Sequence, residues 1–207
     1  MFYVLFSAVV KPEHAKKGEQ YYTKLQPILN KTAGFIEEIP FSDPSNPSGQ
    51  LLFANFEDAA SIMRWRSNKT HLRIMHHARH QIFEQFRVTV GSDEAPIGDR
   101  EGRVVVVYTR QESPRDLKED SKELSTIVSA DASSIEDEME FYVGESQWMW
   151  VARLRAGRKA KDFEDLLRRV PNDAVTRMYV TREYTQNDRR EAPTGIDAAE
   201  KKASALD

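Results

Sequence analysis

The chain has 207 residues, of which 40% are hydrophobic and 30% are charged, a balance typical of a globular protein with one large or two small domains. The formal net charge of −3 gives no electrostatic basis for binding nucleic acid, which favours clustered positive charge. The absence of cysteine excludes disulfides, thiolate metal sites and cysteine nucleophiles.

The first half of the chain predicts the element order β-α-β-β-α-β. The expected strands are residues 2–10, 35–41, 50–56 and 85–90, and the expected helices are 13–31 and 58–81, the second interrupted near Ser67 and Asn68. The first strand lacks the flanks of a signal peptide, and no apolar run approaches the ~18 residues needed to cross a bilayer. We therefore expect a cytoplasmic protein with no membrane contact.

A weaker copy of the same order predicts a second unit. Its expected strands are residues 103–109, 139–143, 147–154 and 176–184, with helices at 114–135 and 161–169. This divides the chain into a first unit (1–95), a linker (96–102), a second unit (103–186) and a flexible tail (187–207). Each unit has the ferredoxin-like order, so the predicted class is α+β, with two units paired sheet to sheet as a pseudo-dimeric barrel.

The stretch from Phe53 to Val90 brings an indole, an imidazole and several guanidiniums close together in sequence. Trp65 offers a flat face that suits either an aromatic ligand or the core. His71 follows six residues later, and its imidazole can serve as a general base or can brace the helix break by bonding to a backbone carbonyl. Both alternatives stay open at this point.

Asn55 lies near the end of the third expected strand, ten residues before Trp65. Alternation puts Leu51, Phe53 and Asn55 on one face of this strand, with Leu52, Ala54 and Phe56 on the other. If the first set faces a pocket, the Asn55 amide can donate a hydrogen bond to a ligand. If the second set does, Asn55 is only a strand-end residue.

Three further histidines follow on the same helix. His76 and His80 have the spacing that puts two imidazoles on one helix face. No His-Glu-x-x-His pattern and no acidic third ligand accompany them, so we expect no metal site. The sequence leaves open which of His71, His76 and His77 faces a pocket.

The segment Trp65–Arg66–x–x–x–x–His71, followed by an arginine-containing helix, resembles the antibiotic biosynthesis monooxygenase family of dimeric α+β barrels. The resemblance implies a cofactor-independent monooxygenase acting on a small hydrophobic aromatic or enolisable, polyketide-like compound. In that case Trp65 stacks the substrate, Asn55 donates to its oxyanion and His71 assists proton removal. Further substrate contacts are then expected from Ser7, Phe53, Arg66, Met75 and Arg79.

The haem-degrading branch of the family differs at two positions. Its axial histidine lies ten residues after the tryptophan, where this chain has Met75, and its first-strand asparagine corresponds to Ser7. We therefore expect no haem degradation and no cofactor. The alternative function is a non-catalytic small-molecule or haem-binding protein of the same fold, and a purely structural module is a third.

The second half contains Trp148 and Trp150 but no Trp-x5-His segment after them. We expect these indoles to pack between the two sheets, and the second unit to be a degenerate partner without its own site. The sequence does not identify the substrate or decide whether two chains also form a homodimer.

Overall fold

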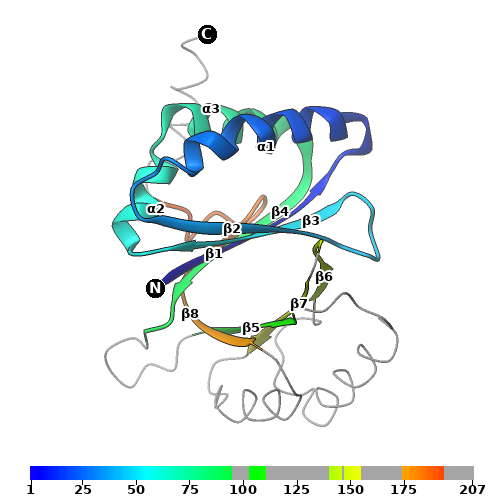
Figure 1. Cartoon of the computed structure of the whole chain (residues 1–207). Coiled ribbons are helices and arrows are strands. Elements are labelled where there is room, and N and C mark those ends of the chain that lie inside the picture. The colour runs from blue at the N-terminus through cyan, green and yellow to red at the C-terminus, as the bar shows by residue number, and fades with distance from the viewer. Residues whose placement is uncertain (95–102, 111–139, 146, 155–173, 194–207) are drawn as a thin grey trace. The chain divides into compact units, whose positions relative to one another are not determined.

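The computed structural model describes residues 1–94, 103–110, 140–145, 147–154 and 174–193 (Figure 1). The chain forms two compact units, each of which combines separate stretches of sequence. The first unit comprises Met1–Pro40, Ser45–Val90 and Arg182–Asp207, and the second comprises Phe41–Pro44 and Gly91–Thr181. The expected linker and the two expected helices of the second half lie outside the described residues.

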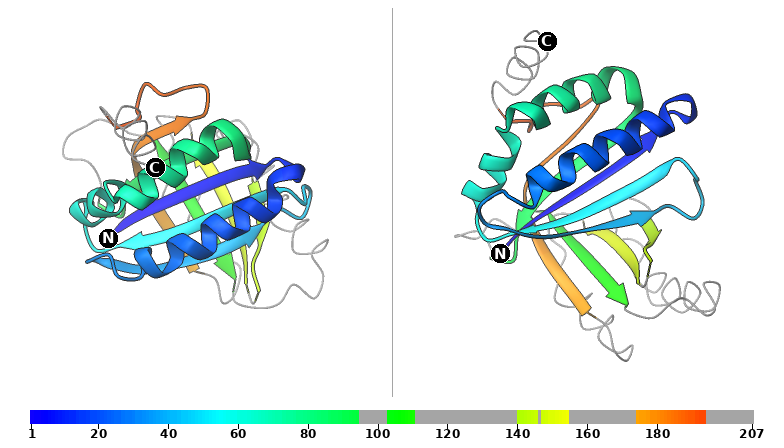
Figure 2. Two further views of the ribbon diagram at one scale, coloured as in Figure 1. Left: turned by 90° about the horizontal axis from the view of Figure 1, so that it is seen from above. Right: turned by 45° about the horizontal axis from the view of Figure 1, so that its top comes forward.

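The first unit has the predicted order of elements. They are β1 (Phe2–Val10), η1 (Pro12–His14), α1 (Ala15–Leu29), β2 (Phe35–Ser42), β3 (Gly49–Phe56), α2 (Ala59–Arg66), α3 (Lys69–His77), η2 (Ala78–Ile82) and β4 (Phe83–Ser92). The strands are arranged β4-β1-β3-β2, which is the ferredoxin-like order. The two long helices α1 and α3 lie side by side over one face of this sheet (Figure 2).

The second unit repeats this arrangement of strands. Its strands are β5 (Val104–Arg110), β6 (Glu140–Val143), β7 (Trp148–Leu154) and β8 (Ala174–Thr185). They are ordered β8-β5-β7-β6, which is again the ferredoxin-like order when counted from β5. The predicted β6–β7 hairpin is confirmed, with Val143 opposite Trp148. The α+β class is therefore confirmed, and the strands of both units follow the ferredoxin-like order.

The pairing of β1 with β3 determines which side chains face the helices. The two strands are antiparallel, and their register runs without interruption from the pair Phe2 and Phe56 to the pair Val9 and Gly49. Ala54 and Phe56 pack with Leu29 of α1, and alternation then puts the other face of β3 away from the helices. A second core cluster continues on the helix side around Ala8, Val10, Ala78, Ile82, Phe83, Phe86, Val88 and Val90.

Two N-caps explain the helix break that the sequence predicts. The Asp58 carboxylate accepts a hydrogen bond from the Ser61 N–H at 2.6 Å and begins α2. The Asn68 side chain accepts from the backbone N–H groups of Thr70 and His71, at 3.0 and 3.2 Å, and begins α3. Such caps satisfy N–H groups that have no partner within the helix, so the chain can turn between α2 and α3 at little cost.

Gly34 is expected to be among the least replaceable residues of the first unit. Its φ of 78° lies in the left-handed region, and a Cβ there would lie 2.0 Å from the Ser61 Oγ. The Gly34→Ala variant should therefore lose at least about 1 kcal/mol of unfolding free energy in urea titrations. Gly18 lies in α1 and provides the matched control, because a Cβ there would make an ordinary 3.5 Å contact with Val10 of β1. The Gly18→Ala variant should lose no unfolding free energy and should gain up to about 1 kcal/mol. Equal stability of the two variants would contradict this account of Gly34.

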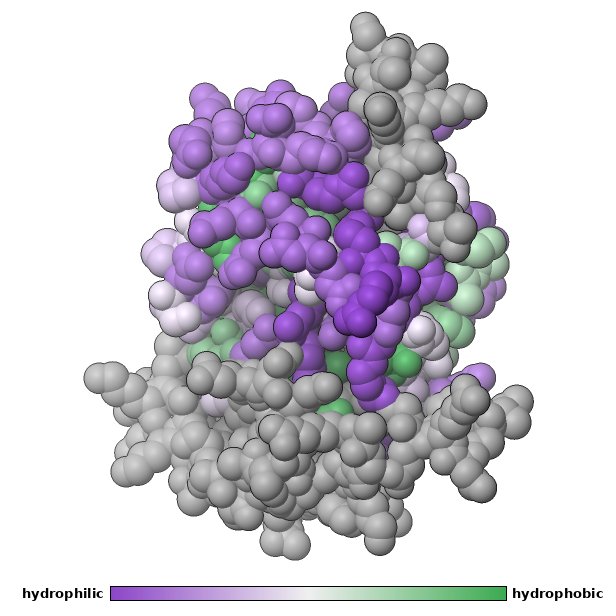
Figure 3. Space-filling view, turned by 180° about the vertical axis from the view of Figure 1, so that it is seen from behind, coloured by the Kyte–Doolittle hydropathy of each residue, from purple (hydrophilic) through white to green (hydrophobic). Residues whose placement is uncertain are grey.

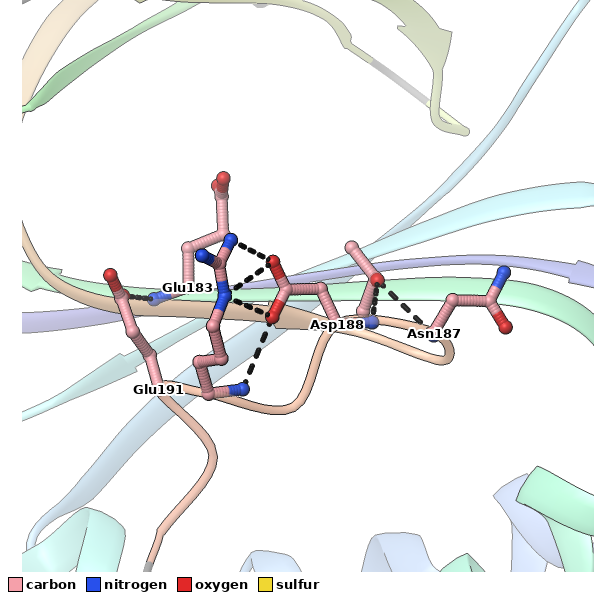
Figure 4. A network of polar contacts seen from close by, with 6 residues as sticks. Glu183, Asn187, Asp188 and Glu191 are labelled. Carbon is pink, nitrogen blue, oxygen red and sulfur yellow. Dashed lines mark hydrogen bonds and ion pairs between the residues drawn. The ribbon is translucent and has the colours of Figure 1, made fainter.

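The end of β8 and the turn after it belong to the first unit. The Gln186 N–H donates to the Phe86 carbonyl of β4 at 3.2 Å. In the turn, Asp188 binds Arg190, and the Glu191 carboxylate accepts from the Glu183 N–H at 2.6 Å (Figure 4). The expected flexible tail thus includes residues 187–193, which form this turn, and residues 194–207, which lie outside the described ranges.

Among the described residues, no helix has both the length and the apolar character needed to cross a membrane.

Candidate functional site

The break between α2 and α3 brings Trp65 and His71 into direct contact. Trp65 lies in the last turn of α2 and His71 in the first turn of α3. Their rings lie 4.2 Å apart between centroids, at an interplanar angle of 35°. Trp65 also packs against the cluster of Leu29, Ala54 and Phe56 while remaining part-exposed. The indole therefore serves the core and still presents surface for a ligand.

The hydrogen bonds of His71 determine which of its nitrogens carries the proton. The ring donates to the backbone carbonyl of Arg66, whereas Nδ1 is buried and has no hydrogen-bond partner among the described residues. With the proton on Nε2, Nδ1 presents a lone pair. His71 thus braces the helix break, which was one of the two alternatives, and it also offers one buried acceptor.

Burial lowers the pKa of His71 to about 4, although the bond to the Arg66 carbonyl acts in the opposite direction. A pKa this low makes His71 a weaker general base than an ordinary histidine. The cause is desolvation, which disfavours the charged imidazolium. At pH 7 the ring is neutral, so it accepts a hydrogen bond well and binds a proton only weakly.

Asn55 lies on the opposite face of the sheet from Trp65 and His71. The residues next to it, Ala54 and Phe56, pack on the helix side, so alternation directs Asn55 the other way. There it is buried and donates to Glu37 at 2.7 Å, while its Oδ1 is buried with no partner among the described residues. This corrects the expectation that the three residues share one pocket.

The other expected substrate contacts divide between the same two faces. Ser7 and Phe53 share the Asn55 face, where Phe53 stacks on Tyr3 with ring centroids 5.8 Å apart. Met75 packs on the helix side, against the core cluster that includes Ala78 and Ile82. Arg79 lies in η2, and its substrate role stays a prediction.

The C-terminal end of β8 adds residues that the sequence did not single out. Tyr184 packs against the same helix-side cluster as Met75. The Arg189 guanidinium lies over the Tyr184 ring, 5.0 Å from its centroid. Burial, and next the positive charge of Arg182, lower the pKa of the part-buried Arg66, while Tyr184 raises it. Sequence order could not reveal that Tyr184 joins this cluster, because more than 100 residues separate it from Met75.

The remaining histidines make local contacts. His76 and His80 lie 4.6 Å apart between ring centroids, and the His80 Nδ1 lies 2.7 Å from the His76 carbonyl oxygen. In the part of the chain that the structure describes, no group of three or more histidines and carboxylates is placed to hold a metal ion. On the face seen in Figure 3, hydrophilic residues cover most of the helix-bearing part of the first unit.

In the second unit the two indoles belong to an aromatic cluster. Trp148 and Trp150 are both buried, and each packs on Phe141, with ring centroids 5.7 and 5.1 Å apart. No described histidine accompanies them, since all five histidines precede residue 81. The packing of these indoles between two sheets stays a prediction.

Comparison with known proteins confirms the family resemblance for the first unit. Residues 1–77, which include Asn55, Trp65, Arg66 and His71, match the family model described as antibiotic biosynthesis monooxygenase. A curated relative, the jasmonate monooxygenase ABM of Pyricularia oryzae, is 29% identical over 113 residues, which are 54% of this chain and 53% of that protein. The match therefore spans about half of the relative's length.

Two solved structures are similar at low identity. A crystal structure of an antibiotic biosynthesis monooxygenase is 17% identical with a TM-score of 0.42, covering 46% of this chain and 100% of its own. A putative monooxygenase from Lactobacillus acidophilus is 11% identical with a TM-score of 0.42, covering 89% of this chain and 96% of its own.

Proposed function

Because residues 1–77 match the antibiotic biosynthesis monooxygenase family, we propose that the first unit is a cofactor-independent monooxygenase-like enzyme. Its substrate is a small hydrophobic compound that is aromatic or enolisable. The observation that carries the proposal is the Trp65–His71 pair, in which the tilted indole lies beside a buried Nδ1 that lacks a partner among the described residues. The name of the Pyricularia oryzae relative, a monooxygenase of jasmonate, supports oxygen chemistry on a small organic molecule.

The geometry suits an enolisable substrate that supplies its own electrons. Trp65 stacks on the ring system, and the Nδ1 of His71 accepts a hydrogen bond from the enol hydroxyl. The nearby guanidinium of Arg66 favours the enolate, so a weak base is sufficient to form it. The enolate reduces dioxygen: a CH2 group and O2 give a C=O group and one water. The substrate is oxidised by four electrons, and no external reductant is required.

A second candidate is a binding protein of the same fold without catalysis. The observation that favours it is the pKa of about 4 for His71, which makes the ring a weak base. In this case the same indole and the same acceptor hold a ligand, but no proton is removed. The two candidates share a site and differ in whether oxygen is consumed.

Oxygen uptake with 1,8-dihydroxy-9-anthrone as an enolisable test compound distinguishes the two. The wild type should consume one O2 per quinone formed, above the rate without protein. In the His71→Phe variant the rate of oxygen uptake should be lower by roughly 100-fold or more, which is the usual contribution of a positioned proton acceptor. The exposed His80 provides the control, and His80→Phe should keep the wild-type rate. Retained binding with no uptake above background would favour the binding protein.

A further inference from the structure

We propose that the outer surface between α1 and α3 docks an acidic helix of a partner protein. This surface, the basic seam, has as its exposed members Lys17 and Lys24 of α1 together with Lys69 and His77 of α3. The basic seam goes beyond the proposed function, because it takes no part in the oxygen chemistry at Trp65 and His71.

A contact between two rings fixes where α1 and α3 meet. The Tyr21 ring of α1 packs edge-on against the His77 ring of α3, with centroids 5.7 Å apart. The Lys17 ammonium lies over the same Tyr21 ring, 4.9 Å from its centroid. Lys24 follows Tyr21 by three residues, so it leaves α1 on the same side. Both lysines are therefore on the side of α1 that faces α3, and the two helices lie side by side in Figure 2.

Helical spacing gives α3 a matching row of basic side chains. Lys69 and His77 are eight residues apart, with Arg73 midway between them, so all three belong to one stripe of α3, and His77 shows that this stripe meets α1. In α1 the one acidic residue is Glu19, which is two positions from Lys17 and therefore on another side of the helix. No carboxylate of α1 or α3 therefore neutralises the basic seam.

The net charge of −3 conceals a division of charge along the chain. Residues 1–90, which include both helices, contain 11 lysines and arginines against 8 aspartates and glutamates, whereas residues 91–207 contain 19 against 25. The segment 59–83, which includes all of α3, has five lysines and arginines and no acidic residue. Among the described residues, neither Lys24 nor Lys69 forms an ion pair. The positive charge of the basic seam is therefore available to a partner.

The position of Lys69 is unfavourable for stability, which argues against a merely solvated helix face. Lys69 is the first residue of α3, where the positive end of the helix dipole favours an acidic side chain, and the first turn of α3 has none. Arg73 follows four residues later, and like charges at this spacing destabilise a helix. Lys24 has no acidic residue three or four positions away either. Residues that break local rules in this way are expected at functional surfaces.

Three features of the basic seam favour an acidic protein helix over a membrane or a nucleic acid. The large apolar side chains exposed in the described part of the chain are Met1, Ile36 and Met63, none of them in α1 or α3, whereas a helix that lies on a membrane inserts an apolar face. The exposed side chains of the basic seam are lysines and a histidine, whereas the planar fork of arginine suits phosphate best. Lys17 and Lys24 are seven residues apart, about 10 Å along α1, and carboxylates on one face of a helix recur at the same spacing.

The test uses two labelled, alanine-rich helical peptides, one with a stripe of glutamates and one with glutamines in their place, and measures their affinities for the full chain by fluorescence anisotropy. The wild type should bind the glutamate peptide at least tenfold more tightly than the glutamine peptide. Lys24→Glu and Lys69→Glu should each weaken the binding of the glutamate peptide about tenfold. Lys16→Glu is the matched control, because Lys16 is exposed but leaves α1 about 100° away from Lys17, and it should change the affinity less than about twofold. Thermal melting of all three variants checks that they fold.

Equal affinity for the two peptides, no binding of either, or a glutamate-peptide affinity that neither Lys24→Glu nor Lys69→Glu weakens would overturn the basic seam as a docking surface. An equal loss of affinity in Lys16→Glu would overturn it as well, because the effect would then follow net charge and not position. Vesicles of phosphatidylserine and phosphatidylcholine in equal amounts and a short DNA duplex are the remaining probes. Tighter binding to either of these than to the glutamate peptide would overturn the acidic helix as the partner.

Discussion

Replacing Trp65 with alanine is expected to weaken the binding of an apolar aromatic probe, 1-naphthoate, by roughly 30-fold or more, and to lower the unfolding free energy by about 2–3 kcal/mol. A fully buried aromatic residue replaced by alanine costs about 3–5 kcal/mol. The loss should be smaller here because Trp65 is only part-buried, although it packs against Leu29, Ala54 and Phe56. Loss of an aromatic anchor typically weakens binding by about 2 kcal/mol or more, which is roughly 30-fold in affinity. Urea titration and calorimetry on the same preparation measure both effects.

The Trp65→Phe variant separates packing from ligand contact. It should keep most of the stability, because a phenyl ring still covers the apolar cluster, and it should keep part of the ring contact with His71. If Trp65→Ala melts at the same temperature as the wild type, or binds the probe as tightly as the wild type does, the indole does not have this double role.

Protonation of His71 is expected to make the protein less stable as the pH falls from 7 to 4.5. The pKa of His71 is lowered from 6.5 in the unfolded chain to about 4 in the folded protein. Below pH 6.5 the unfolded state gains a proton that the folded state does not bind, so the stability contributed by the neutral ring is lost between these two values. The expected contribution to the loss is about 2–3 kcal/mol at pH 4.5.

The His71→Phe variant isolates this contribution, since all other titrating groups are shared with the wild type. At pH 7 the variant should be less stable by about 1 kcal/mol, because the Arg66 carbonyl loses its donor. This difference in unfolding free energy should shrink as the pH falls, and near pH 4.5 the variant should be the more stable protein. A constant difference in stability between the variant and the wild type across this range would contradict a His71 that stays neutral in the folded protein.

The order of elements in the first unit could be predicted from sequence because each signal is local. Strand 2–10, the turn-rich segment after residue 41 and the helix break at Asn68 all depend on residues that are neighbours along the chain. The Trp65–His71 contact was predictable for the same reason. The break between α2 and α3 fixes its geometry, and both rings lie within seven residues.

The side of β3 that faces the helices could not be decided in this way. Alternation separates Phe53 and Asn55 from Ala54 and Phe56, but both faces contain apolar residues and are largely buried. The choice depends on packing against Leu29 of α1, which is a tertiary contact. Similarly, the packing of Tyr184 against the helix-side cluster depends on the return of the C-terminal segment to β4, which connects residues far apart in sequence.

The most direct test of a ligand site at Trp65 uses the indole N–H signals in a proton–nitrogen correlation spectrum. The chain has three tryptophans, Trp65, Trp148 and Trp150, so three indole signals are expected, and the Trp65→Phe spectrum identifies one of them. On addition of 1-naphthoate, the Trp65 signal should shift and saturate at the affinity found by calorimetry, while the signals of Trp148 and Trp150 stay in place. Shifts confined to Trp148 or Trp150, or no indole shift at saturation, would contradict a ligand site at Trp65.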